Sequence, residues 1–204
     1  MENINPKEAL KFLEFVNNLK HMPRRGWIFS KVKDHEQIAG HMYAMAMMTF
    51  MLGDSSKLDR LKCLQLAVVH DLAEAIVGDI TPHDNVTEED KHRQEDEAMK
   101  EITSHLGPEI GSMVYNLYKE YEAKETPEAK FVKDLDRFDL LFTATQYEKR
   151  DKTPHKCQEY FNSLNGKFEN SYIRRLVSEL TQQRMSVPGV GDSEVPSKST
   201  TNGI

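Results

Sequence analysis

The chain has little of several residue types, and each shortage excludes a class of protein. Among 204 residues there are only two cysteines, Cys63 and Cys157. Both lie in helix-like contexts without zinc-ribbon spacing, which favours a reduced intracellular protein over a disulfide scaffold. No apolar stretch approaches the roughly 18 residues that span a bilayer, and no basic region followed by an apolar run begins the chain. We therefore expect no membrane partner and a cytoplasmic location, with the nucleus as the alternative.

Charge and length narrow the possibilities further. The formal net charge of −6 gives no general attraction for nucleic acid, so we expect no nucleic-acid partner. A hydrophobic fraction of 38% and a charged fraction of 29% are typical of a globular domain. Ser, Pro, Gly, Thr and Asn dominate the C-terminal end. We predict one domain over residues 1–184 and a disordered tail over residues 185–204.

Apolar residues recur at helical spacing along most of the chain, and no run of alternating β-branched residues is present. This pattern predicts an all-α fold. The expected helices cover about residues 6–22, 35–52, 63–69, 87–105, 108–123, 127–147, 157–164 and 172–180. We expect Pro and Gly within residues 22–27 to interrupt the first helix, and the polar residues 148–154 to connect two later ones.

The stretch Val68-Val69-His70-Asp71 carries the strongest chemical signal. An apolar helical run ends there in an imidazole beside a carboxylate, and an unpaired buried charge is costly. A cation is therefore the expected partner. Helical spacing also places His41 on an inward face rich in methionine. A lone inward histidine is more often a core residue bonded to a backbone carbonyl, and the pattern alone leaves that interpretation open.

A later acidic helix offers the remaining ligands. Asp136 and Asp139 both lie near an apolar stripe of phenylalanine and leucine, and the spacing does not choose between them. Two histidines and two carboxylates form a mixed nitrogen and oxygen set. Such a set suits Co, Mn, Fe, Ni or Zn and leaves coordination positions for water.

The order of His41, His70-Asp71 and Asp136 resembles the H…HD…D pattern of the HD-domain superfamily of metal-dependent phosphohydrolases. Over about residues 8–182 the chain is similar to the eukaryotic HD domain-containing protein 2 group, relatives of the bacterial 5'-deoxynucleotidases. The segments that carry this likeness are Pro23-Arg24-Arg25-Gly26-Trp27, His41-Met42-Tyr43, His70-Asp71-Leu72-Ala73-Glu74, Val77-Gly78-Asp79-Ile80 and Glu128-Ala129-Lys130-Phe131-Val132-Lys133.

The resemblance implies a fold, an activity and a set of metal ligands. The fold would be a single HD-domain helical bundle with the metal site in its core. His41, His70, Asp71 and Asp136 would bind one divalent ion. The chain would hydrolyse deoxyribonucleoside 5'-monophosphates to deoxynucleoside and phosphate, and it would form a homodimer.

The resemblance also assigns an acidic pair close to the phosphate. Glu74 and Asp79 match the family's residues near the phosphate and the attacking water. In the eukaryotic group they help to hold a second ion, magnesium, with Ile80 contributing its backbone carbonyl. Glu74 would orient or deprotonate the water.

Substrate recognition is assigned in the same way. Trp27 matches a tryptophan that packs against the sugar and disfavours a 2'-hydroxyl, and the preceding arginine matches a phosphate ligand. Both Arg24 and Arg25 fit that description, and we favour Arg24. Two departures stand out, because Gly40 replaces a usual acidic residue and Ala44 an arginine frequent in the eukaryotic relatives.

The sequence alone leaves two other functions possible. The chain resembles HD proteins broadly enough to act on a nucleoside triphosphate, a cyclic nucleotide or a phosphodiester instead. A catalytically silent nucleotide-binding protein could keep the same metal ligands for stability alone. Phosphate release from deoxynucleoside monophosphates separates these possibilities.

Overall fold

The computed structural model describes residues 4–53 and 56–186, and within these ranges every regular element is a helix. The elements are α1 (Pro6–Leu19), α2 (Arg25–Phe29), α3 (Ile38–Met48), η1 (Thr49–Met51), α4 (Arg60–Val69), α5 (Glu74–Val77), α6 (Glu88–Ser104), α7 (Pro108–Ala123), α8 (Pro127–Asp151), α9 (Gln158–Leu164) and α10 (Ser171–Met185). An isolated bridge between Pro23 and Gln37 is the one β pairing in the described part of the chain. The predicted all-α fold is confirmed. Among the described helices, none is long and apolar enough to cross a membrane.

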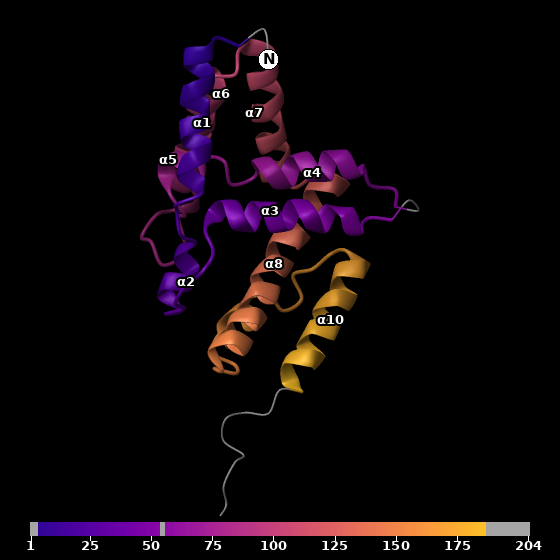
Figure 1. Ribbon diagram of the computed structural model, residues 1–204. Coiled ribbons are helices and arrows are strands. Elements are labelled where there is room, and N and C mark those ends of the chain that lie inside the picture. Colours follow the sequence, from indigo (N-terminus) through magenta and orange to yellow (C-terminus); the bar gives the residue numbers. More distant parts are fainter. Residues whose placement is uncertain (1–3, 54–55, 187–204) are drawn as a thin grey trace, which may run out of the picture.

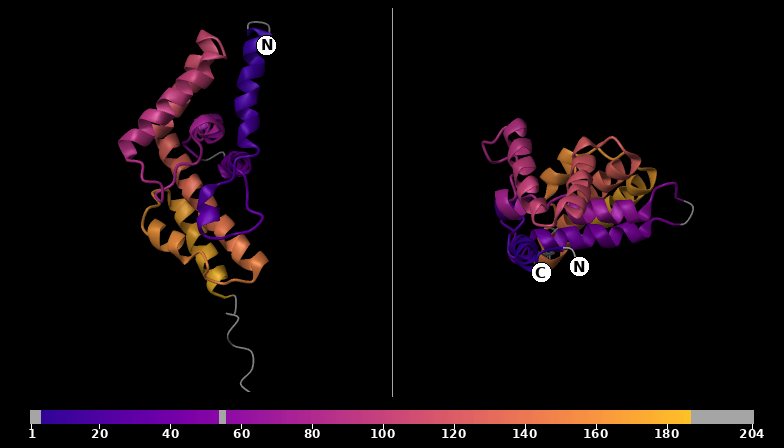
Figure 2. Two further views of the ribbon diagram at one scale, coloured as in Figure 1. Left: turned by 90° about the vertical axis from the view of Figure 1, so that its left-hand side faces the viewer. Right: turned by 90° about the horizontal axis from the view of Figure 1, so that it is seen from above.

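Three helices meet at the centre of the molecule. α3 and α4 lie side by side, and α8 packs against both of them (Figure 1). On one side of this centre, α10 runs along α8; on the other, α6 and α7 form a hairpin with α1 beside α6 (Figures 1 and 2). One continuous apolar core includes buried residues of α3, α4, α7 and α8. Polar side chains at the α3–α4–α8 junction are therefore held by packed helices.

Local hydrogen bonds explain where five of the described helices begin. A side-chain oxygen at the N-cap accepts a backbone N–H of the first turn, which satisfies a donor that the helix leaves free. The five capping residues are Asn5, Asp59, Thr87, Thr126 and Asn170. At Thr87, for example, the side-chain hydroxyl accepts the backbone N–H of Asp90. These five helix starts are thus set by residues next to them in the sequence.

The predicted boundary at the C-terminal end of α8 is wrong. The segment 148–154, expected to be a connection, instead continues α8 to Asp151. Its polar residue Glu148 is buried, where it accepts the Nε–H of Arg184 at 2.7 Å and the backbone N–H of Cys157 at 2.7 Å. Because a tertiary partner neutralises Glu148, the polar sequence does not end the helix.

The N-terminal helix and the tail also differ from expectation. α1 ends at Leu19, and the segment expected only to interrupt it contains the short helix α2. Leu10 and Leu13, which share a predicted apolar stripe, are 62% and 54% exposed. Met185, the first residue of the predicted tail, is the last residue of α10. Residues 187–204 of that tail lie outside the described residues.

Candidate metal centre and substrate cavity

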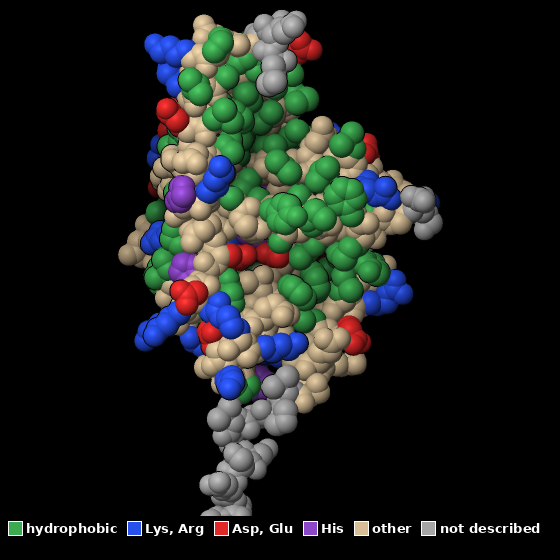
Figure 3. Space-filling view, in the orientation of Figure 1, with side chains coloured by type: hydrophobic (Ala, Val, Ile, Leu, Met, Phe, Trp, Pro, Cys, Tyr) green, Lys and Arg blue, Asp and Glu red, His purple; other side chains and the backbone are tan. Residues whose placement is uncertain are grey.

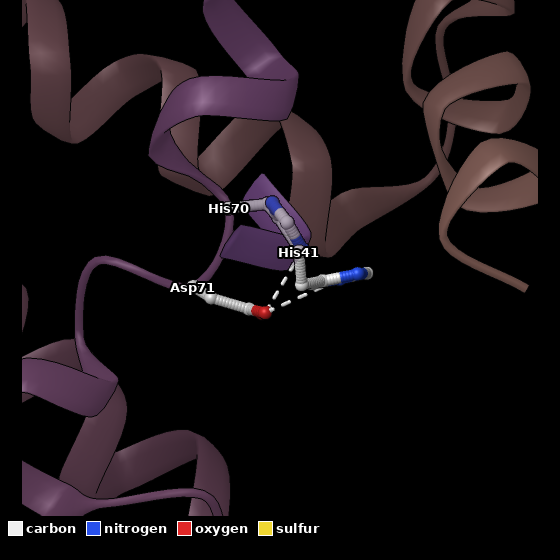
Figure 4. Close-up of side chains that lie close together, drawn as sticks. All are labelled: His41, His70 and Asp71. Carbon is white, nitrogen blue, oxygen red and sulfur yellow. Dashed lines mark ion pairs between the residues drawn. The ribbon is translucent and has the colours of Figure 1, made fainter. Parts of the chain in front are cut away.

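The central helices bring the four predicted ligands together. His41 is on α3, the His70-Asp71 pair follows α4, and Asp136 is on α8. The Nε2 atom of His41 lies 3.3 Å from Asp136 Oδ1 and 3.6 Å from Asp71 Oδ2. The Nε2 atom of His70 lies 3.0 Å from Asp71 Oδ2, and Figure 4 shows Asp71 facing both imidazoles. Segments distant in sequence thus place two ring nitrogens against two carboxylates.

Hydrogen bonds on the other ring nitrogens determine how the two imidazoles are oriented. His41 Nδ1 lies 2.6 Å from Asp139 Oδ2, and His70 Nδ1 lies 2.9 Å from the carbonyl oxygen of Ala67. With Nδ1 donating to these acceptors, Nε2 of each ring has a lone pair for a metal ion. Both Nε2 atoms are buried and have no hydrogen-bond partner.

The two candidate aspartates on α8 therefore occupy different positions. Asp139 contacts the outer nitrogen of His41, whereas Asp136 faces its inner nitrogen. The second oxygen of Asp136, Oδ2, accepts hydrogen bonds from Lys133 Nζ at 2.7 Å and from the hydroxyl of Tyr121 at 3.0 Å. These donors leave Oδ1 of Asp136 beside the inner nitrogen of His41, whereas Asp139 contacts the outer nitrogen.

The charges of the cluster are strongly coupled. Burial alone would raise the pKa of the Asp71 and Asp136 carboxyls, but His70 beside Asp71 and Lys133 beside Asp136 outweigh it and lower both pKa values. Burial and Arg24 lower the pKa of His41, yet its contacts with Asp136 and Asp139 raise that pKa to about 9. Without an ion, a proton on His41 thus offsets part of the acidic charge.

A cavity of about 250 Å³ opens onto this cluster. Arg24 lines it, with Nε 3.8 Å from Glu36 Oε1 and a buried Nη1 that has no partner. Arg25 does not line it, because its guanidinium donates to both oxygens of Asp84, at 2.7 and 2.9 Å. The geometry thus places Arg24 where an anion would enter, and gives Arg25 a different partner.

Glu74 and Asp79 line the same cavity. Burial raises the pKa of both carboxyls, and the charges of Asp71 and Asp79 raise that of Glu74 further. Asp79 Oδ2 also accepts the backbone N–H of Arg25 at 2.6 Å. Ile80, by contrast, lines a neighbouring pocket and is absent from the cavity wall.

This neighbouring pocket, of about 360 Å³, shares Arg24 and Asp79 with the cavity and has Trp27 in its wall. Trp27 is only 1% exposed, so the pocket meets little more than an edge of the indole. The rings of Tyr147 and Tyr160 meet it edge-on, with centroids 5.1 and 5.3 Å away. The two hollows therefore adjoin, one polar and one with an aromatic wall.

The two departures from the family pattern lie outside both hollows. Gly40 is exposed, and a Cβ added there would come no closer than 3.9 Å to Glu36 Cβ. Ala44, one turn further along α3, is half-buried and lines neither hollow. Neither residue therefore borders the cavity onto which the clustered side chains open.

Several residues that shape the site were not singled out from the sequence. Lys133 and Tyr121 hold Asp136, and Glu36 lies beside Arg24. The three-residue spacing between Lys133 and Asp136 on one helix is a signal that was available. A further group on the cavity rim, His92 with Glu95 and Glu122, has the His92 Nδ1 atom 3.0 Å from Glu122 Oε2.

The clustered residues fit a divalent ion. An ion bound between the two imidazoles would satisfy both buried Nε2 atoms, which no protein group satisfies. Neutral imidazole and carboxylate are ligands for Mn, Fe, Co, Ni and Zn alike, so the donor set indicates a divalent metal without naming it.

Comparison with known proteins agrees with this geometry. The sequence model of the family described as HD domain matches residues 16–176. The chain is 44% identical over 180 residues to the 5'-deoxynucleotidase HDDC2 of Xenopus laevis, covering 88% of this chain and 89% of that protein. It is 47% identical over 177 residues to the 5'-deoxynucleotidase hdd1 of Schizosaccharomyces pombe, covering 85% and 88%. The crystal structure of the PH0347 protein from Pyrococcus horikoshii OT3 superimposes with a TM-score of 0.69 at 29% identity, covering 86% of this chain and 98% of that one.

Proposed function

This chain belongs to the HD-domain family, and we propose that it is a divalent-metal-dependent 5'-deoxynucleotidase. It hydrolyses deoxyribonucleoside 5'-monophosphates to deoxynucleoside and inorganic phosphate. One observation carries the proposal: the buried Nε2 atoms of His41 and His70, both beside Asp71, and the buried Nη1 of Arg24 have no hydrogen-bond partner, and His70, Asp71 and Arg24 line one polar cavity. A cation at the first two and a phosphate at the third would satisfy all of these atoms.

His41, His70, Asp71 and Asp136 are the residues that would hold the ion. When bound, a divalent ion polarises a phosphate oxygen and lowers the pKa of water. We assign it to the group Co, Mn, Fe, Ni or Zn. Asp139 and the Ala67 carbonyl keep both imidazoles in the ligating tautomer, while Lys133 and Tyr121 hold Asp136.

Arg24 and Glu74 would act on the substrate itself. The free Nη1–H groups of Arg24 donate to the phosphoryl oxygens and offset their charge. Glu74, whose pKa is raised by burial and by Asp71 and Asp79, accepts a proton from the attacking water nearer to neutral pH than an ordinary carboxylate does. Attack on phosphorus breaks the bond to O5' and releases the nucleoside.

We further propose that Glu74 and Asp79 hold a second ion, magnesium, with the Ile80 carbonyl as a third ligand. Both carboxyls line the cavity, and oxygen ligands are those that magnesium prefers. Ile80 itself lines the adjoining pocket, which shares Asp79 with the cavity.

A metal-by-substrate panel tests the activity. Phosphate release is measured from each deoxynucleoside 5'-monophosphate and its ribonucleotide counterpart, with Co, Mn or Mg added to the metal-free protein. We expect turnover of the deoxy series only when metal is present. Turnover of triphosphates or cyclic nucleotides without any phosphate release from monophosphates would contradict the proposal. Binding without any turnover would indicate a silent nucleotide-binding protein.

We also propose that the protein forms a homodimer through the outer face of α3 and α4. This face exposes apolar side chains over both helices (Figure 3): Tyr43, Met47, Phe50, Leu61 and Val68. Tyr43 is 68% and Phe50 61% exposed, and monomers rarely expose large contiguous apolar patches. Light scattering after gel filtration should give twice the mass of one chain, and Phe50→Glu should halve it.

A cytoplasmic location, or a nuclear one, accompanies this proposal. The two cysteines, Cys63 and Cys157, are free and buried, as expected where thiols are kept reduced. A fluorescent fusion observed together with a nuclear stain distinguishes the two compartments.

A further inference from the structure

Glu36 occupies a central position that the proposed chemistry does not use. It lies in the loop just before α3, five residues ahead of His41. Its carboxylate is close to Arg24 and also contacts Trp27, which lines the adjoining pocket. The Glu36 side chain thus contacts both Arg24, the proposed phosphate ligand, and Trp27, the sugar contact that the family resemblance implies.

Glu36 contacts Arg24 through both its side chain and its backbone. Glu36 Oε1 lies 3.8 Å from Arg24 Nε, and both side chains are only 17% exposed. The backbone N–H of Arg24 also donates to the carbonyl oxygen of Glu36 at 3.4 Å. The guanidinium is therefore paired on its Nε side, while Arg24 lines the cavity and its buried Nη1 has no hydrogen-bond partner.

A hydrogen bond to the indole makes the second link. Trp27 Nε1–H donates to the same Glu36 Oε1 atom at 3.0 Å. The backbone N–H of Glu36 donates to the hydroxyl of Tyr147 at 2.7 Å, and the Tyr147 ring packs edge-on against Trp27. Glu36 is thus held by α8 while it holds the indole.

We infer that Glu36 is a positioning residue that sets Arg24 for the phosphate and Trp27 for the sugar. It acts through those two side chains and does not touch the substrate. The inference rests on the proposed function, which assigns the phosphate contact to Arg24, and on the sugar contact that the family resemblance implies for Trp27. Replacing Glu36 with glutamine or with alanine tests its two contacts separately. The amide oxygen of glutamine still accepts the N–H of Trp27 but carries no charge for Arg24, whereas alanine removes both contacts.

The test compares Glu36→Gln with Glu36→Ala. Inorganic phosphate is titrated calorimetrically into each purified protein, and the emission of Trp27, the one tryptophan of the chain, is recorded. We expect both variants to bind phosphate about tenfold more weakly, a loss typical of one charge-assisted contact. Emission should shift in Glu36→Ala and stay unchanged in Glu36→Gln. The deoxy/ribo ratio of kcat/KM should follow the emission.

Whether the affinity for phosphate falls or rises in the Glu36 variants decides between two roles of this residue. If Glu36 were only a nearby negative charge, its neutralisation would strengthen phosphate binding. Tighter or unchanged phosphate binding in Glu36→Gln, or unshifted Trp27 emission in Glu36→Ala, would therefore overturn the inference. The matched control is Glu97→Ala on α6, where the side chain is 64% exposed and contacts Arg93; it should leave phosphate binding and emission unchanged.

The two readouts also keep this inference separate from the activity itself. Phosphate affinity and Trp27 emission are measured without turnover. A wild-type protein that releases no phosphate from deoxynucleotides would contradict the proposed function. The Glu36 links would still be tested by the titration and by the spectra. Should Glu36→Ala fail to fold, the isosteric Glu36→Gln retains the phosphate test.

Discussion

The metal cluster and the adjoining pocket are built in different ways. The clustered ligands come from α3, α8 and the end of α4, which pack together in the core. His41, His70 and Asp136 each have a second partner within the protein that fixes their orientation. The pocket wall instead combines α2, which has five residues, the loop between α5 and α6, residues of α9 and Leu140 of α8. The proposed metal ligands thus lie on or beside packed helices, whereas most of the pocket wall comes from short helices and a loop.

Hydrogen bonds of Arg25 connect α2 to the loop between α5 and α6. Arg25 donates to both oxygens of Asp84, and Asp84 accepts the N–H of Thr81 at 2.8 Å. The backbone N–H of Arg25 also binds Asp79. A bidentate pair gives geometric specificity, but this one is partly exposed and contributes modestly to stability. The pocket therefore depends on hydrogen bonds between short segments, whereas packed helices hold the ligand cluster.

The largest expected effect comes from a ligand of the cluster. Asp71→Asn should lower kcat/KM for deoxynucleoside monophosphates by at least about 10³-fold, because it removes a charged ligand that faces both imidazoles. Phosphate release and bound metal are both measured. Asp59→Asn, at the opposite end of α4, preserves a capping residue and should leave turnover unchanged. Near-wild-type activity in Asp71→Asn would refute the ligand assignment.

A smaller effect is expected from the residue behind His41. Asp139→Asn should weaken metal binding by about 10–100-fold, because it removes the charge that orients the imidazole. Isothermal calorimetry with Mn or Co measures the affinity. Asp134→Asn is the matched control, since Asp134 is equally buried on α8 but accepts the N–H groups of Glu169 and Asn170. It should lower the melting temperature without changing metal affinity; equal losses in both variants would contradict the role of Asp139.

Metal affinity should also depend on pH. The pKa of His41 is raised to about 9 in the metal-free protein, so below that pH the imidazole is protonated and an ion has to displace the proton. Affinity should therefore rise about tenfold per pH unit below pH 9, as expected for release of one proton. Calorimetry in buffers of different ionisation enthalpy counts the released protons. Affinity that is independent of pH would show that His41 is not a ligand.

The smallest effect is expected in the pocket. Trp27→Ala should narrow the deoxy/ribo ratio of kcat/KM by about tenfold, the scale of discrimination against one extra group. It should also lower the melting temperature, because the buried indole fills the core beside Tyr147 and Tyr160. Trp27→Phe keeps most of the packing and should give an intermediate ratio. A folded Trp27→Ala protein with the wild-type ratio would exclude Trp27 as the discriminator.

Prediction from the sequence succeeded where the information is local. Helical periodicity predicted the inward position of His41, which is fully buried. It failed at residues 148–154, where Arg184 neutralises Glu148 from 36 residues away. Helical spacing also places Leu10 and Leu13 on one apolar face of α1, yet both side chains are exposed because no described helix covers them. Spacing specifies a face of a helix and cannot specify what packs against that face.

By itself, the sequence determined the helical architecture, the His70-Asp71 pair and the likeness to HD-domain proteins. The tertiary structure decided between residues that the spacing could not separate. Asp136 and Asp139 are three residues apart on α8, yet one faces the inner nitrogen of His41 and the other its outer nitrogen. Arg24 reaches the cavity and Arg25 is bound to Asp84. The physical reason is the same in both cases, because each choice depends on a partner that only the packing of distant helices and loops brings within reach.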